Sequence, residues 1–181
     1  LPDASVTLAS GTMLATDGDG SSLTGVGVTE ADQWRITTDF AGNVGPITAN
    51  WERCDNKGSG YLGTGMSLSS GIWTFPSTGF WLVFCYANLY LSTGNSVYSG
   101  IGLKATDDDS AYTTVLNAQS SFADGSAGNY TRVSGSIIFD VTDTANIKIS
   151  MHTSFNNTAV VCKGYTDENV SGLNFVKLAE T

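Results

Sequence analysis

The chain has 181 residues, of which 41% are hydrophobic and only 14% charged, and its 8 basic and 17 acidic side chains give a net charge of −9. This length suits one domain with a substantial core, and the hydrophobic share excludes a disordered chain. The acidic balance excludes proteins that bind nucleic acid or anionic lipid through basic patches. No apolar run approaches the ~20 residues of a membrane-spanning helix, so no membrane insertion is expected.

Residues 1–30 differ in composition from the rest of the chain. They are rich in Gly, Ser, Thr and Asp, with only isolated Val, Leu and Met. Such a segment cannot build a core by itself, so we expect an extended stem or docking arm at 1–30 and a head at 31–181. The chain begins at Leu1 rather than Met, so we expect either a processed or trimmed product or a sequence whose start is not included, and no targeting segment can be assigned.

From residue 31 onward, short apolar runs alternate with turn signals rich in Gly, Asn, Asp and Pro, and no helical period is sustained. Many short strands at this spacing are typical of an antiparallel two-sheet sandwich or jelly roll, which makes the expected fold class all-β. Strands are predicted at 33–40, 46–52, 59–68, 71–76, 79–91, 98–105, 112–119, 130–140, 145–153, 158–163 and 171–178.

The strand expected at 79–91 is apolar on both faces. An antiparallel strand with one wet face alternates apolar and polar residues, so a second cover is needed here. Because no helix is expected, a second copy of the chain is the remaining cover. One set of side chains should meet the core and the other a subunit interface, and the pattern leaves open which does which. The sets are Trp81, Val83 and Cys85 on one side, and Phe84 and Tyr86 on the other.

Three segments follow one another in a characteristic order. GIWTFPSTGFWLVFCYANL joins two aromatic strands by a Pro-x-x-Gly turn, VSGSIIFDVTDTANIKISM (133–151) turns at acidic residues between two strands, and SGLNFVKLA (171–179) closes the chain. Together they resemble the C1q/TNF-like jelly-roll family over most of 34–180. The first segment carries the resemblance on Trp73, Phe75, Pro76, Gly79, Trp81 and Phe84.

The resemblance implies a compact homotrimer in which each subunit is a jelly roll of about ten antiparallel strands. In each subunit the last strand lies beside the central aromatic strand. The chain departs from the family at the acidic turn, which often carries Gly-Asp and here runs from Asp140 to Asp143, and it has no collagen-like Gly-X-Y stalk. The residues assigned by this reading to the trimer interface or core are Trp81, Val83, Phe84, Cys85, Tyr86 and Phe175.

Two further segments resemble parts of bacteriophage appendages. DGDGSSLTGVG (17–27) is similar to stem segments that precede the heads of tail fibres, and 29–67 is similar to the opening of C1q-like heads in structural proteins of aquatic bacteriophages. This resemblance implies a non-enzymatic virion protein, exposed on the particle surface, at the tip of a tail fibre or spike. Residues 1–30 would contact other virion proteins.

In this reading, loops at one end of the head bind a host-surface glycan or protein, because loops vary on a rigid scaffold. The alternatives are a capsid decoration or head-fibre protein that braces the shell, and a secreted C1q/TNF-like ligand or lectin. The loops expected to make the contact are 92–97, 106–111, 121–130 and 154–158.

Residue types suited to catalysis are sparse. The sole histidine, His152, lies on the polar phase of its strand, which favours a surface or trimer-axis position. No nucleophile elbow, zinc-protease motif or phosphate-binding loop occurs. We expect no enzymatic activity and no cofactor other than calcium.

Calcium could bind at two acidic clusters. Asp107, Asp108 and Asp109 stand together in a loop, where like charges repel unless a cation or water separates them, and a solvent-exposed turn is the alternative. Residues 17–21 resemble the first half of a calcium loop, but Val28 stands where the twelfth position needs Glu.

Cysteines, aromatic residues and glycosylation sequons give further expectations. The odd number of cysteines argues against a disulfide scaffold and favours a reducing compartment, with Cys85 and Cys162 buried and Cys54 in an exposed polar loop. Three aromatic residues could stack on glycans or else pack into the core: Trp34, Trp51 and Tyr130. Glycosylation sequons, usable only in a secreted protein, occur at Asn129, Asn156 and Asn169.

Overall fold

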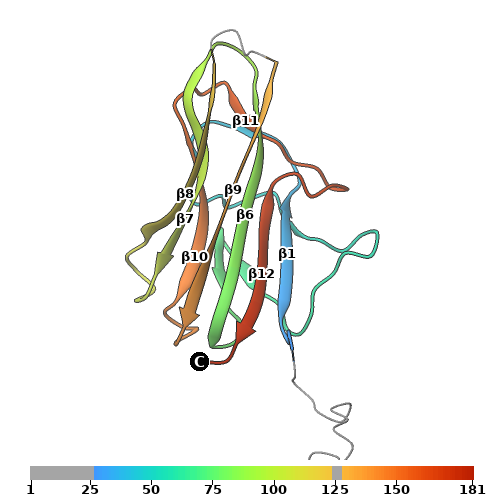
Figure 1. The fold of residues 1–181 in the computed structure, drawn as a ribbon, viewed down its shortest axis with the longest axis vertical. Helices are drawn as coiled ribbons and strands as arrows, with labels where there is room; N and C mark the ends of the chain where they lie inside the picture. Colours follow the sequence, from blue (N-terminus) through green and yellow to red (C-terminus); the bar gives the residue numbers. More distant parts are fainter. Residues whose placement is uncertain (1–26, 124–127) are drawn as a thin grey trace, which may run out of the picture.

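The computed structural model of the protein describes residues 27–123 and 128–181, and within these ranges the chain forms twelve β-strands and no helix (Figure 1). This confirms the all-β fold class. The described residues therefore contain no helix able to cross a membrane. The strands are β1 (Ala31–Ile36), β2 (Phe40–Ala41), β3 (Trp51–Arg53), β4 (Ser67–Ser69), β5 (Ile72–Thr74), β6 (Gly79–Leu91), β7 (Ser96–Thr106), β8 (Thr113–Phe122), β9 (Tyr130–Val141), β10 (Lys148–Phe155), β11 (Val160–Cys162) and β12 (Gly172–Ala179).

Two antiparallel sheets pack against each other (Figure 1). In the β6 sheet the order is β2-β11-β6-β12-β1-β3, and β9 pairs with the other edge of β6. In the β7 sheet the order is β4-β5-β10-β7-β8. Strands far apart in sequence are neighbours in space, as the first strand β1 pairs with the last strand β12.

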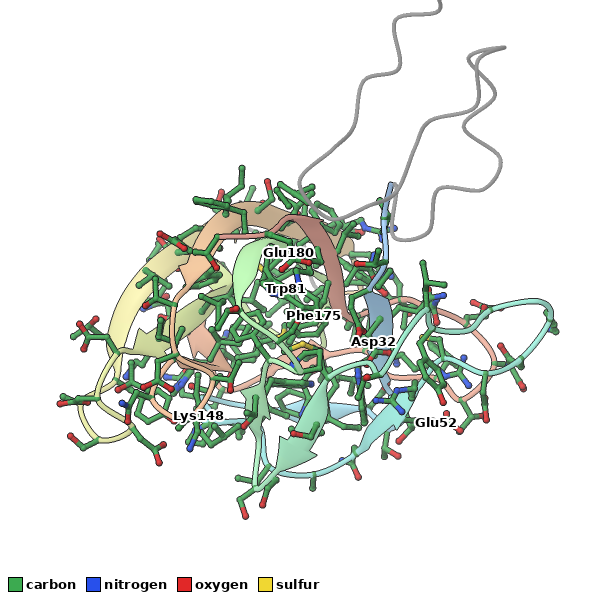
Figure 2. The ribbon with its side chains drawn as sticks, turned by 90° about the horizontal axis from the view of Figure 1, so that it is seen from below. Asp32, Glu52, Trp81, Lys148, Phe175 and Glu180 are labelled. Atoms are coloured by element: carbon green, nitrogen blue, oxygen red, sulfur yellow. The ribbon has the colours of Figure 1, made fainter. Side chains whose placement is uncertain are left out.

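The core lies between the two sheets and is rich in aromatic side chains. Trp81 and Phe175 of the β6 sheet point into it, and Figure 2 shows both in the interior of the molecule. Phe75 lies with its ring centroid 5.4 Å from that of Trp81, and Trp73 lies 6.2 Å from Phe175. Full burial of each such side chain stabilises the fold by about 1.5–3 kcal/mol. Because Trp73 comes from β5 of the opposite sheet, the cluster holds the two sheets together.

The strands predicted between residues 71 and 178 are confirmed within a few residues. Two earlier predictions are largely wrong, because 46–52 and 59–68 contain only β3 and the start of β4. Asn50 has a φ of 64°, and Gly63 and Gly65 have φ values of 75° and 72°. These left-handed conformations break an extended run, so residues 59–66 lie in a loop.

A buried carboxylate holds that loop in place. Asp32 is 3% exposed and accepts hydrogen bonds from the Met66 amide at 2.7 Å and from Trp34 Nε1 at 2.9 Å. The Arg53 guanidinium donates to the same carboxylate at 3.0 Å and lies over the rings of Trp34 and Tyr61. These side-chain contacts, together with a single β-bridge between Ala31 and Leu62, hold the loop in place of the continuous strand that the sequence pattern predicts here.

All three cysteines are buried, so the expectation that Cys54 is exposed is wrong. The Cys54 amide donates to the carbonyl of Gln33 in β1 at 2.9 Å, and its Sγ donates to Asn169 Oδ1 at 3.1 Å. The polar sequence around Cys54 gives no sign of this, because both partners come from other parts of the chain. Cys85 and Cys162 are buried as predicted.

Two buried thiols, Cys85 and Cys162, should make the free energy of unfolding depend on pH in the alkaline range. Burial raises the pKa of Cys85 to about 11 and that of Cys162 to about 12, from ordinary values of 9.0. A raised thiol pKa contributes stability below the ordinary pKa, and this is lost as pH rises through the folded-state value. We expect the free energy of unfolding in urea to fall from pH 9 to pH 12, with a smaller fall in Cys162→Ala. Equal falls in both proteins would contradict this assignment.

Candidate subunit interface

The outward face of the β6 sheet carries a contiguous apolar patch. Side chains alternate along each strand, and the register places Leu82 beside Ile138 of β9 and Val176 of β12. We define the β6-face patch as Phe80, Leu82, Phe84, Ile138 and Val176.

This patch exposes large side chains to solvent. Ile138 is 57% exposed, Phe80 38% and Phe84 36%. Single exposed apolar residues are normal on a protein surface, but neighbouring ones on one sheet face mark a site of association. The outward row of β10 in the opposite sheet is instead polar, with Ser150, His152 and Ser154. The β10 row therefore offers no comparable apolar patch, and the exposed Val97 and Val115 of that sheet lie on other strands.

The outward row continues toward the far end of β6 as a tyrosine-rich stretch. Tyr86 stacks on Phe84 with ring centroids 5.7 Å apart, and Arg132 of β9 lies 5.4 Å from the centroid of Tyr86. Tyr86 is only 4% exposed, and its burial raises the pKa of its hydroxyl to about 12. Beyond it, Tyr90 and Tyr130 pack with centroids 4.9 Å apart. Toward the far end of β6, the outward face therefore gains polar groups, namely tyrosine hydroxyls and the Arg132 guanidinium.

An unpaired polar atom lies beside the patch. Asn174 of β12 stands next to Phe84 in the register, and its Oδ1 is buried without a hydrogen-bond partner among the described residues. A buried acceptor without a donor costs about 1–3 kcal/mol. A donor from a second copy of the chain would remove this cost.

The structure decides which set of β6 side chains faces the core. Trp81, Val83 and Cys85 are fully buried between the sheets, and so is Phe175 on β12. Phe84 points outward and is partly exposed, whereas Tyr86 points outward but is covered by its neighbours. Of the residues assigned to core or interface, Phe84 and Tyr86 therefore belong to the candidate interface.

Of the five patch residues, only Phe84 was among the predicted interface residues, and Phe80 and Ile138 are the most exposed of the other four. Phe80 stands at the start of β6, and Ile138 follows Ile137 in β9, where two adjacent apolar residues must point to opposite faces. The pair Ile137–Ile138 was a usable signal, since Ile137 packs against the core and Ile138 is exposed.

The acidic triplet forms a structured turn. The Asp108 carboxylate accepts hydrogen bonds from the Ala111 amide, the Thr106 hydroxyl and the Ser110 amide, and these hold its pKa well below the usual range. Asp109 pairs with Lys148 at 2.7 Å. Among the described residues, no three His, Cys, Asp or Glu side chains are placed to hold a metal. Calcium at Asp107, Asp108 and Asp109 stays a prediction, and residues 17–21 lie outside the described part of the chain.

His152 and the aromatic candidates take different places. His152 lies on the β7 sheet, away from the β6-face patch, and its Nε2 is 2.9 Å from Ser150 Oγ. Trp34 and Trp51 pack against the core, and the Trp51 ring is 4.6 Å from that of Trp73. Tyr130 is 58% exposed and is the one of the three candidates with a largely open ring.

The loops expected at one end of the head are divided between its two ends. Asn157 donates to the carbonyls of Thr93 and Asn95, and the Leu91 amide donates to the carbonyl of Asn129, so three of the four loops gather beyond β6. The loop at 106–111 lies at the opposite end of the sandwich, the end at which the C-terminus also lies (Figure 1). Its assignment to the same end was wrong, because β7 carries it along the full length of the sheet.

Solved structures similar to this chain are jelly rolls of the TNF type. The TNF protein Eiger from S. frugiperda superposes with a TM-score of 0.63 at 13% identity, covering 83% of this chain and 93% of its own. Murine APRIL at pH 8.5 superposes with a TM-score of 0.58 at 13% identity, covering 82% and 98%. No protein-family profile and no curated protein sequence matches. The likeness shows that the fold is the C1q/TNF-like jelly roll.

Proposed function

We propose that this chain is the non-enzymatic head of a homotrimeric bacteriophage appendage, which binds a host-surface glycan or protein at the tip of a tail fibre or spike. The observation that carries the assembly is the β6-face patch. Burying an exposed Phe or Ile contributes about 1.5–3 kcal/mol, and each copy offers several such side chains. The jelly-roll fold and the family resemblance support three copies around this face.

The two ends of the sandwich support two different roles, attachment to the virion at one end and contact with the host at the other. The described chain enters at residue 27 and leaves at Thr181 at the same end of the molecule (Figure 1). Residues 1–30 can therefore join the head to other virion proteins at that end. The loops around 92–97 and 154–158 lie at the other end, with Tyr130 close by, and are free to contact a host surface. Three copies would give such a contact avidity.

The solution mass of the purified chain tests the assembly. Light scattering after size exclusion should give three times the chain mass of 18.9 kDa at micromolar concentration. A single-chain mass under these conditions would contradict a trimeric head.

Labelling of purified virions tests the location. A gold-conjugated antibody against the head should mark the tips of tail fibres or spikes. Gold on the capsid shell would overturn the tail assignment in favour of a decoration or head-fibre protein, and unlabelled particles would overturn the virion role.

A further inference from the structure

The outward face of the β7 sheet contains a polar depression of about 260 Å³. It lies on the opposite side of the sandwich from the β6-face patch. Its lining comes from three adjacent strands and consists of Gly102, Lys104, Thr114, Asn117, His152, Thr153 and Ser154.

The depression exists because the middle strand lacks side chains at its centre. Gly102 of β7 lies between Asn117 of β8 on one side and His152 of β10 on the other. Gly100, the next outward position, lies between Gln119 and Ser154. Polar side chains therefore stand on both sides of a floor made of backbone.

Lys104 supplies a positive charge that nothing in the described structure neutralises. It is half-buried next to Gly102, its register neighbours are Ser150 and Thr114, and the described residues give it no ion pair. No acidic residue lines the depression, although the chain has 17. Burial lowers the pKa of His152, and the nearby charge of Lys104 lowers it further.

Three of the other four lysines are paired, and the fourth, Lys57, lies exposed in a loop. Lys148, Lys163 and Lys177 each contact a carboxylate, from Asp109, Asp39 and Glu180 respectively. A cation in a polar hollow, on a protein of net charge −9, is suited to an incoming anion.

We propose that this depression binds an acidic saccharide, whose carboxylate or phosphate group pairs with Lys104 while Thr114, Asn117 and Ser154 contact its hydroxyls. Hydroxyl and amide side chains are both donors and acceptors, as sugar hydroxyls require. The volume admits about one sugar ring, since it falls below the ~300–1,000 Å³ of drug-sized pockets. The site lies away from the β6-face patch, so it does not depend on the assembly proposed above.

Titration calorimetry at low salt tests the site with D-glucuronate, glucose 6-phosphate, inorganic phosphate and neutral glucose. We expect saturable binding of at least one sugar anion and none of glucose, with affinity falling as salt rises. Lys104→Gln should weaken binding roughly tenfold or more, because a charge-assisted hydrogen bond is lost. Lys57→Gln, in an exposed loop outside the depression, is the matched control and should bind as the wild type does.

Glucuronate and glucose 6-phosphate separate the carboxylate from the phosphate as the preferred group. The proposal is overturned if neither binds, if glucose or inorganic phosphate binds as tightly as the sugar anions, or if Lys104→Gln binds unchanged. The imidazole NMR signals of His152 give a second readout, because a bound anion should raise the pKa of that ring. Light scattering on the same samples reports the oligomeric state separately, so failure of this site and failure of the trimer are distinguishable.

Discussion

The double variant Phe84→Asp/Ile138→Asp is expected to run as single 18.9 kDa chains. Both side chains belong to the β6-face patch and are exposed in the isolated chain, so the fold tolerates the change. In the assembly, each substitution forfeits about 1.5–3 kcal/mol of apolar burial and places a carboxylate against an apolar surface. Two such losses at each contact weaken association by more than about a hundredfold. Light scattering across a dilution series measures this.

A control separates the loss of the patch from the addition of charge. Val97 of β7 is 69% exposed and lies outside the patch, so Val97→Asp should keep the wild-type mass. Circular dichroism should show β structure in all three proteins. A Phe84→Asp/Ile138→Asp protein that retains the wild-type oligomeric mass would exclude this face as the interface.

Replacing Asp32 by Ala is expected to lower the free energy of unfolding by about 3–5 kcal/mol, the usual cost of breaking a buried ion pair. The change removes the acceptor of the Met66 amide and Trp34 Nε1, and it leaves the Arg53 guanidinium without its carboxylate. The loop between β3 and β4 would lose its side-chain attachment through Asp32 and keep the backbone hydrogen bonds between Ala31 and Leu62. Urea unfolding monitored by tryptophan fluorescence measures the loss.

Asp55→Ala provides the comparison. The Asp55 side chain is 74% exposed and pairs with Arg35 at 3.4 Å, and Arg35 keeps Glu52 at 2.9 Å when Asp55 is removed. Exposed pairs contribute up to about 1 kcal/mol, so this variant should change stability little. Similar losses in the two variants would show that Asp32 is not the anchor of the loop.

Local pattern predicted the long strands well because their signal is itself local. Apolar runs bounded by turn residues at 79–91 and 130–140 placed β6 and β9 nearly at their ends. The same method failed at 59–68, where Gly63 and Gly65 adopt left-handed φ and the attachment comes from Asp32. A side chain some thirty positions away in the sequence leaves no trace in a window of ten residues.

The candidate interface was predictable only in part. The apolar residues on both faces of 79–91 indicated that this strand needs a second cover. The structure shows the uncovered surface, which consists of Phe80, Leu82 and Phe84 on β6 and Ile138 on β9. The polar depression had no sequence signal, because its lining comes from strands separated by up to about fifty positions. Only the β8-β7-β10 register brings Asn117, Gly102 and His152 into one row.

Local sequence pattern was sufficient to predict that the chain is all-β, that its central strand is the aromatic one at 79–91, and that this strand needs covering on both sides. The fold class follows from short apolar runs bounded by turn residues, and the need for a second cover follows from the apolar side chains on both faces of 79–91. The tertiary structure alone decided that Trp81 faces the core and Phe84 the outside. The core side of β6 is the side onto which Trp73, Phe75 and the opposite sheet pack. Packing between segments that are distant in the sequence cannot be inferred from the order of neighbouring residues.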